Sequence, residues 1–495
     1  MTIVLSEPLQ HRRRMPYAPA AMHRRCLSAP LLRCVVVALF AAACSNGSTE
    51  DAARTDWLTW GFGVERHGYN PEETTIGVGN VDELRQVWSV DLGANIDTAA
   101  MVATGIDVDG TRRDLAFAGT EHGAFYAIDL ADGEIVWKRQ FSTQTIPCSE
   151  SPDNVFGITA AAAIDKAQNR AYVAAADGNL HALDLRTGAE VKGWPLKLTD
   201  DPAHEFVLSA PTPWKDLLYV TTASHCDIPP YEGKIFAIDK TAATARHVFW
   251  ITGEGPPLGG SVWGWGGVSV DPTTGDVFAA TGNAIDFREF AEYGDQIVRL
   301  TGDLKPLASH APPTVGIDDD FGSTPVLFHR RGCPPQLAAM RKHGALYLYN
   351  RDAIARGPQQ TIDVSGTPYR LIGLPAFWPD ENLLFVANPT PPPDGSYTHG
   401  MLAFEVTPGC RLELVWAKTA GRNDSVTSTP TVANGVVYYG DGMGNQLHAF
   451  NARNGDRLWS SDPADLGGAV FVAPVVVNGT VLAGAWDGHL HAWRT

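Results

Sequence analysis

The sequence predicts an all-β protein, an eight-bladed β-propeller whose blades are four-stranded antiparallel sheets. Two observations carry this prediction. One local pattern recurs eight times along the 495 residues, and the two ends of the patterned region complete each other. Repeats of about fifty residues that contain several short alternating strands are typical of propeller blades.

The recurring pattern is a glycine, then an alternating apolar strand that ends in a polar residue, and then usually a turn and a tryptophan. The clearest copy is HGAFYAIDLADGEIVW, which ends at Trp137. Asp-Gly and Asn-Gly turns, as in VANGVVYYGD at residues 432–441, divide each repeat into strands A to D. Strand C follows the glycine, and strand D carries the tryptophan. The residues that end the eight C strands are Asp129, Asp184, Asp239, Thr301, Asn350, Glu405, Asn451 and Arg494.

The ends of the chain predict how the ring closes. The last repeat stops after its strand C, HLHAWRT, whereas residues 84–93, LRQVWSVDLG, form a D-type strand ahead of the first complete repeat. We therefore expect the N-terminal strand to complete the last blade. Such closure removes the open sheet edges at which another chain could add.

Two kinds of residue recur at fixed places in the repeat. Six tryptophans fall on strand D, where packing between blades explains them: Trp88, Trp137, Trp194, Trp250, Trp416 and Trp459. Three histidines, His181, His448 and His491, occupy one position of strand C in the sequence Leu-His-Ala. Recurrence at a repeat position favours a structural role over metal binding.

The N-terminus predicts export. Arginines precede the apolar run CVVVALFAAAC at residues 34–44, which is too short to span a bilayer. Three alanines stand directly before Cys44, and this arrangement resembles a bacterial lipobox. We expect a signal peptide at 1–43, a lipid on Cys44, a flexible tether at 44–56 and a single propeller domain at 57–495. The protein would then be a periplasmic or cell-surface lipoprotein, held at the outer membrane by its lipid. The alternative is an ordinary signal peptide with an incidental cysteine.

Charge excludes one class of partner. The chain carries a net charge of −17, and residues 1–43 hold six arginines against Glu7, a net +5, so the mature chain carries −22. Such a chain repels polyanions, and we expect no nucleic-acid partner.

Four cysteines remain in the mature chain besides Cys44, and an even number in an exported chain suggests two disulfides. Because successive strands run in opposite directions, the D–A and B–C loops open on one face of the ring, here called the first face. Cys148 and Cys226 belong to that face, whereas Cys333 and Cys410 lie in hairpins of the opposite face. The sequence therefore predicts Cys148–Cys226 and Cys333–Cys410. The alternative is four free thiols.

Unusual residues also gather on the first face. Ser261, Trp263 and Trp265 precede strand A of the fourth blade, and Asn283 follows its strand B. The acidic IDDDFG at 317–322 precedes the next strand A, and RKHG at 341–344, which contains Lys342, precedes a strand C. Flat rings among glycines, hard oxygens and a cation fit an acidic aromatic cofactor held with Ca²⁺. Taken singly, these residues could be a turn, a solvated loop and a surface charge.

The fourth blade carries a family resemblance. Its Ser261, Trp263, Asp271-Pro272 and Thr281-Gly282-Asn283 resemble the pattern of the pyrroloquinoline-quinone (PQQ) dehydrogenase superfamily, eight-bladed quinoproteins, and the likeness covers nearly the whole mature chain. The resemblance implies that Ser261 and Trp263 bind PQQ, with Trp263 stacked on the quinone, and that Lys342 faces the quinone oxygens. It also implies that Asn283 and Asp318 ligate Ca²⁺ and that Asp318 is the catalytic base, after a one-residue shift in the alignment.

Three features of the family are missing. The family's disulfide between adjacent cysteines is absent, and its calcium-binding glutamate has only Asp227 or Glu232 as approximate substitutes. Residues 97–101, DTAAM, lack the glutamate expected in the first blade. These departures affect the site and leave the scaffold intact.

Three functions therefore stay open. The first is a PQQ- and Ca²⁺-dependent dehydrogenase that oxidises an alcohol or similar small substrate and passes electrons to a separate acceptor, since the haem-attachment motif Cys-x-x-Cys-His is absent. The second is a non-catalytic lipoprotein that acts as a scaffold for envelope proteins. The third is a propeller that binds another small ligand under the proline-rich insertion at 388–397. The resemblance favours a quinoprotein-like protein.

Overall fold

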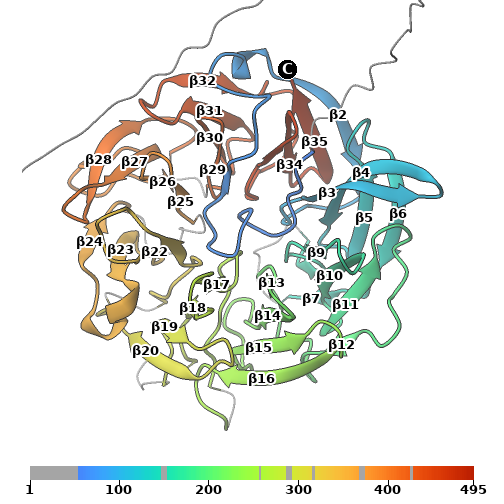
Figure 1. Cartoon of the computed structure of the whole chain (residues 1–495), viewed down its shortest axis with the longest axis horizontal. Helices are drawn as coiled ribbons and strands as arrows, with labels where there is room; N and C mark the ends of the chain where they lie inside the picture. Colours follow the sequence, from blue (N-terminus) through green and yellow to red (C-terminus); the bar gives the residue numbers. More distant parts are fainter. Residues whose placement is uncertain are drawn as a thin grey trace, which may run out of the picture. The chain divides into compact units, whose positions relative to one another are not determined.

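The computed structural model describes residues 54–146, 153–255, 258–285, 292–314, 318–366, 374–423 and 427–495. These residues belong to one compact unit, Ala53–Thr495. Eight sheets stand in a ring around a central axis in this unit (Figure 1). The predicted fold class is confirmed.

The blades follow one another along the chain, and in the first seven the four strands are hydrogen-bonded in sequence order. The first four are β3–β6 (Met101–Val108, Thr111–Gly119, Ala124–Asp129, Ile135–Gln140), β9–β12 (Ala163–Asp165, Arg170–Ala175, Asn179–Asp184, Leu196–Lys197), β13–β16 (Thr212–Trp214, Leu217–Thr221, Lys234–Asp239, Thr244–Trp250) and β17–β20 (Ser269–Val270, Val277–Ala280, Ile297–Leu300, Pro306–His310). The next three are β21–β24 (Val326–Phe328, Gln336–Met340, Ala345–Asn350, Gln360–Asp363), β25–β28 (Ala376–Trp378, Leu383–Asn388, Gly400–Val406, Leu412–Lys418) and β29–β32 (Thr431–Ala433, Val436–Gly440, Leu447–Asn451, Arg457–Ser460).

The eighth blade closes the ring as predicted. It consists of β33 (Val475–Val477), β34 (Thr480–Gly484), β35 (His489–Arg494) and β2 (Arg85–Asp91). β2 pairs antiparallel with β35, so the N-terminal strand is the outer strand of the last blade. Smaller elements are β1 (Tyr69–Asn70), the β7–β8 hairpin (Gln144–Thr145, Val155–Phe156) and two 3-10 helices, η1 (Val81–Glu83) and η2 (Arg351–Arg356).

The tryptophans of the D strands connect neighbouring blades through hydrogen bonds and packing. The indole N–H of Trp137 donates to the carbonyl of Leu185 in the next blade (2.9 Å), and that of Trp416 donates to Ala452 (3.1 Å). The ring of Trp137 also covers Gly188, where an added Cβ would lie 2.5 Å from it. The glycine of the C–D turn is therefore needed to let the neighbouring ring approach. The structural role predicted for these tryptophans is confirmed at these positions.

A segment at residues 57–70 crosses the centre of the ring, which the repeat pattern did not predict. Its backbone hydrogen-bonds in turn to the A strands of six blades, through the pairs Trp57–Val102, Leu58–Ile164, Val64–Val270, Glu65–Leu327, His67–Phe377 and Gly68–Val432. Its Arg66 is fully buried and donates to the carbonyl of Trp60 at 2.6 Å. These bonds satisfy inner strand edges that would otherwise stay open.

One predicted disulfide is present. Cys333, between β21 and β22, and Cys410, between β27 and β28, are bridged with their Cα atoms 5.4 Å apart. Cys44 and Cys148 lie outside the described residues, so the lipid on Cys44 and the Cys148–Cys226 bridge stay predictions. In the part of the chain that the structure describes, no helix has the length and apolar character needed to cross a membrane.

Candidate functional site

The first face brings together loops from the third, fourth and fifth blades. The loop before β17 pairs with the loop after β18 through a bridge between Gly259 and Ala284. The backbone N–H of Lys342, before β23, donates to the carbonyl of Asp320, before β21 (3.0 Å). These contacts join D–A loops to B–C loops, as the predicted strand directions require. We call the resulting cluster, Asp227, Ser261, Trp263, Asn283, Asp318, Asp320 and Lys342, the fourth-blade site.

Trp263 is held by two polar contacts. Its indole N–H donates to the Oδ2 of Asp320 at 2.7 Å, and the Nζ of Lys342 lies 4.9 Å from the centre of its ring. A cation over an indole face is attracted by the negative face of the ring. Both rings pack against the apolar core, Trp263 against one cluster and Trp265 against two others. Of the two rings that the sequence singled out, Trp263 alone carries this polar environment.

Lys342 is the cation of the fourth-blade site. Its Nζ pairs with Asp320 at 2.9 Å and also with Asp318, and its side chain is 16% exposed. Burial disfavours the charge, but the carboxylates of Asp320 and Asp318 outweigh burial and raise the pKa of Lys342. The lysine therefore stays charged, and it offsets the repulsion between two neighbouring carboxylates.

The three consecutive aspartates have three different surroundings. Asp319 pairs with His343 and lies 3.6 Å from the buried Arg341. The side chain of Asp320 is 2% exposed and contacts Trp263, whereas that of Asp318 is 36% exposed. The structure thus places Asp318, the predicted base, at the more open edge, and it adds Asp320 as a buried acid at the centre.

Asn283 and Asp227 supply the remaining oxygens. The Oδ1 of Asn283 is buried without a hydrogen bond, and its Nδ2 lies 3.4 Å from the Oδ2 of Asp227. The hydroxyl of Tyr231 donates to the other oxygen of Asp227 at 2.7 Å. Burial, and then the charge of Asp320, raise the pKa of Asp227. This electrostatic environment favours a bound cation.

The turn Thr281-Gly282-Asn283 needs its glycine. A Cβ on Gly282 would lie 2.0 Å from the Oγ of Ser261 and 2.8 Å from the Oδ2 of Asp320. The N–H of Gly282 also donates to the carbonyl of Ser261 (2.7 Å). Ser261 is 2% exposed, so its buried side chain limits the space at Gly282.

The residues present fit a hard cation such as Ca²⁺. Among the described residues, no three His, Cys, Asp or Glu side chains are arranged to hold a metal ion by themselves, so an amide oxygen has to contribute. The orphaned Oδ1 of Asn283, beside Asp227, is such an oxygen. Glu232, the other proposed substitute for the family's glutamate, pairs instead with Lys234 at 3.3 Å.

A second buried acidic pair on the first face was not predicted. Asp97 accepts a hydrogen bond from the indole N–H of Trp486 (2.6 Å), and Glu121 accepts from the hydroxyl of Thr159 (2.6 Å). Burial, and then the charge of Asp97, raise the pKa of Glu121 to about 8. Glu121 follows a B strand, and the loops after B strands open on the first face. The strand directions that placed Asn283 on that face could therefore have placed Glu121 there too. Glu121 thus places a second carboxyl beside Asp97 in the first blade.

Known proteins resemble this chain in sequence and in fold. Polyvinylalcohol dehydrogenase of a Pseudomonas species is 22% identical over 463 residues, which cover 82% of this chain and 67% of that protein. A europium-containing methanol dehydrogenase has a similar structure, with a TM-score of 0.66 and 16% identity, over 89% of this chain and 98% of that one. BamB from Moraxella catarrhalis follows with a TM-score of 0.54 and 18% identity, over 83% of this chain and 100% of that one.

These matches confirm the resemblance to PQQ-dependent dehydrogenases at the level of the β-propeller. A family model described as outer membrane protein assembly factor BamB matches residues 76–248 and 398–495. Since these residues make up more than half of the chain, the protein belongs to that β-propeller family.

Proposed function

We propose that the protein is a quinoprotein dehydrogenase of the cell envelope, which binds PQQ and Ca²⁺ at the fourth-blade site and oxidises an alcohol or a similar small substrate. The observation that carries this proposal is the arrangement around Trp263. The ring of Trp263, the charged Lys342 and the amide oxygen of Asn283, which has no hydrogen bond, lie in the same cluster of residues. The ring of Trp263 also packs against an apolar cluster, but apolar packing does not explain the buried lysine or the amide oxygen without a hydrogen bond.

Each residue of the site has a role in this proposal. Trp263 offers its ring to a flat cofactor, and Lys342 supplies positive charge to the cofactor's oxygens. The amide oxygen of Asn283, together with Asp227 and Asp318, would hold Ca²⁺. When bound, PQQ supplies the hydride acceptor.

Asp318 is the proposed base. Its carboxylate is the more exposed of the two that contact Lys342, so a substrate hydroxyl could reach it. Burial raises its pKa, and Lys342 opposes that rise. A carboxylate of this kind can take the hydroxyl proton as the substrate is oxidised. The electrons would then leave to a separate acceptor.

The test is reconstitution. Purified protein supplied with PQQ and CaCl₂ should reduce an artificial electron acceptor in the presence of primary or secondary alcohols. The variant Asp318→Asn should lose this activity by at least 100-fold. Activity that persists in Asp318→Asn would assign the base to another residue. A wild-type protein that binds neither PQQ nor Ca²⁺ would remove the proposal altogether.

A non-catalytic scaffold in the envelope is the second candidate. The name of the matching family and the likeness to BamB favour it. As a scaffold, the protein would still be exported and would still carry a lipid on Cys44, but it would need envelope proteins as partners. Cross-linking of the full-length protein in intact cells tests it. A reproducible set of envelope partners, together with failure to bind PQQ, would favour the scaffold.

A further inference from the structure

The three histidines that share one position of strand C do not share one environment. In the second blade, His181 lies 2.7 Å from Glu190 and 3.0 Å from Asp177. In the eighth blade, His491 lies 3.2 Å from Asp487 and 3.0 Å from the amide of Gln86. Both of these rings use both nitrogens inside the blade.

The seventh blade has lost the carboxylates around its histidine. The sequences DGNLHA and DGHLHA, of the second and eighth blades, become DGMGNQLHA in the seventh, where three added residues separate Asp441 from His448. In addition, Arg457 takes the place of Glu190, since each follows the glycine of the C–D turn by two residues. The charge beside the histidine is therefore reversed.

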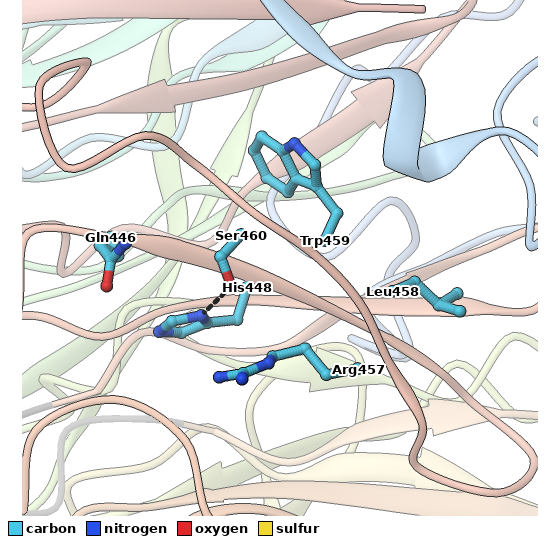
Figure 2. Close-up of a pocket in the computed structure, with 6 residues that line it drawn as sticks. All are labelled: Gln446, His448, Arg457, Leu458, Trp459 and Ser460. Atoms are coloured by element: carbon cyan, nitrogen blue, oxygen red, sulfur yellow. Dashed lines mark hydrogen bonds between the residues drawn. The ribbon is translucent and has the colours of Figure 1, made fainter.

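A pocket of about 400 Å³ opens at this place, lined by Gln446, His448, Arg457, Leu458, Trp459 and Ser460. Figure 2 shows the imidazole of His448 between the side chains of Gln446 and Arg457. Pockets of this volume are of the size that takes small molecules. Among the described residues, no carboxylate lines the pocket, so a cation is a poor occupant.

One ring nitrogen of His448 has no hydrogen-bond partner. The Nδ1 of His448 lies 2.8 Å from the hydroxyl of Ser460, while its Nε2 is buried and has no hydrogen bond. Burial, and then the charge of Arg457, lower the pKa of His448 to about 4, so the ring is neutral. When the ring's single proton is on Nε2, Ser460 donates to Nδ1 and Nε2 can donate to a ligand. An oxyanion that accepts from Nε2 would favour this tautomer and give that nitrogen a hydrogen-bond partner.

Arg457 adds a charge without a counter-ion. Within the described residues its guanidinium makes no ion pair or hydrogen bond, and the neighbouring Asp456 lies nearer to Lys418, at 3.9 Å. A guanidinium binds carboxylates and phosphates through two parallel N–H groups. We propose that this pocket of the seventh blade binds the oxyanion group, carboxylate or phosphate, of a small molecule. This proposal is independent of the function proposed for the fourth-blade site.

The test is calorimetric titration of the purified protein with sodium phosphate and, separately, with sodium succinate, with sodium chloride as the ionic-strength control. We expect saturable binding of at least one of the two oxyanions at one site. The preferred anion then assigns the ligand to the phosphates or to the carboxylates. Absence of saturable binding for both anions would overturn the proposal.

Variants locate the binding. Arg457→Gln and His448→Gln should each weaken binding at least tenfold. Arg453→Gln is the matched control, since Arg453 lies on the same C–D turn but pairs with Glu381 at 2.6 Å, and it should bind as the wild type does. Arg457 is exposed, so its replacement leaves the fold intact. Equal binding by the wild type and Arg457→Gln would place the anion elsewhere and contradict the proposal.

Discussion

The ammonium group of Lys342 lies 4.9 Å from the centre of the Trp263 ring and pairs with the buried carboxylate of Asp320 at 2.9 Å. One cation thus connects the aromatic face of the fourth blade with the acidic loop of the fifth. Because Asp320 is nearly inaccessible to water, Lys342 is the group that offsets its charge.

We predict that Lys342→Met destabilises the protein by about 3 kcal/mol, since the change leaves the Asp320 carboxylate buried without its cation. Urea unfolding of the two proteins measures this difference. Lys418→Met is the control: the side chain of Lys418 is 40% exposed and its Nζ lies 3.9 Å from Asp456, so its loss should cost less than about 1 kcal/mol. Equal effects of the two changes would show that Lys342 is not needed to neutralise Asp320.

The acidic pair of the first face predicts a pH dependence. The pKa of Glu121 is raised to about 8 in the folded protein, from an ordinary 4.5, so the folded state binds this proton more tightly. The stability gained in this way is present below about pH 4.5 and is lost as the pH rises through about 8. Glu121→Gln should therefore be more stable than the wild type at pH 9, by an amount that shrinks towards pH 5. Urea unfolding at the two pH values measures this, and a constant difference would contradict it.

The disulfide predicts a loss of stability when it is removed. Cys333 and Cys410 are 77 residues apart, and their bridge joins the fifth and sixth blades. Replacing both with serine should cost about 2–4 kcal/mol, because the unfolded chain gains freedom. Thermal unfolding of the oxidised wild type and the double variant gives the value. An unchanged midpoint would mean that the bridge adds nothing to the ring's stability.

The signal peptide expected at residues 1–43 predicts that the N-terminus of the mature protein is modified. If residues 1–43 are removed and Cys44 is acylated, the mature protein should begin at Cys44 with a mass increase that corresponds to lipid. Mass spectrometry of protein purified from membranes measures it. An unmodified N-terminus at another residue would support the ordinary signal peptide instead.

The sequence predicted the blades well because a characteristic residue marks each end of every strand C. A glycine opens it, a polar residue such as Asp129 closes it, and alternation fixes which side chains are buried. Ring closure followed from the unpaired strand at residues 84–93. The crossing segment at 57–70 was missed because its repeated hydrogen bonds to the A strands of six blades join backbone groups, which leave no residue pattern.

The site was predicted less completely. The direction of the strands alone decides on which face of the ring a loop opens. For that reason the sequence could place Trp263, Asn283 and Lys342 on one face. It could not choose among Asp318, Asp319 and Asp320, since adjacent loop residues point in directions that depend on tertiary contacts. It also could not show that His448 lacks the acidic neighbours of His181, since that difference depends on how three added residues displace Asp441.

Calorimetric titration of the purified protein with PQQ in the presence of CaCl₂ tests the central claim most directly, with Trp263→Ala as the partner variant. The account predicts saturable, Ca²⁺-dependent binding at one site. It also predicts weaker binding by Trp263→Ala, by about 0.5–1.5 kcal/mol for the lost stacking in addition to the lost contact area. Binding of equal affinity in the wild type and Trp263→Ala, or no binding in either, would contradict it.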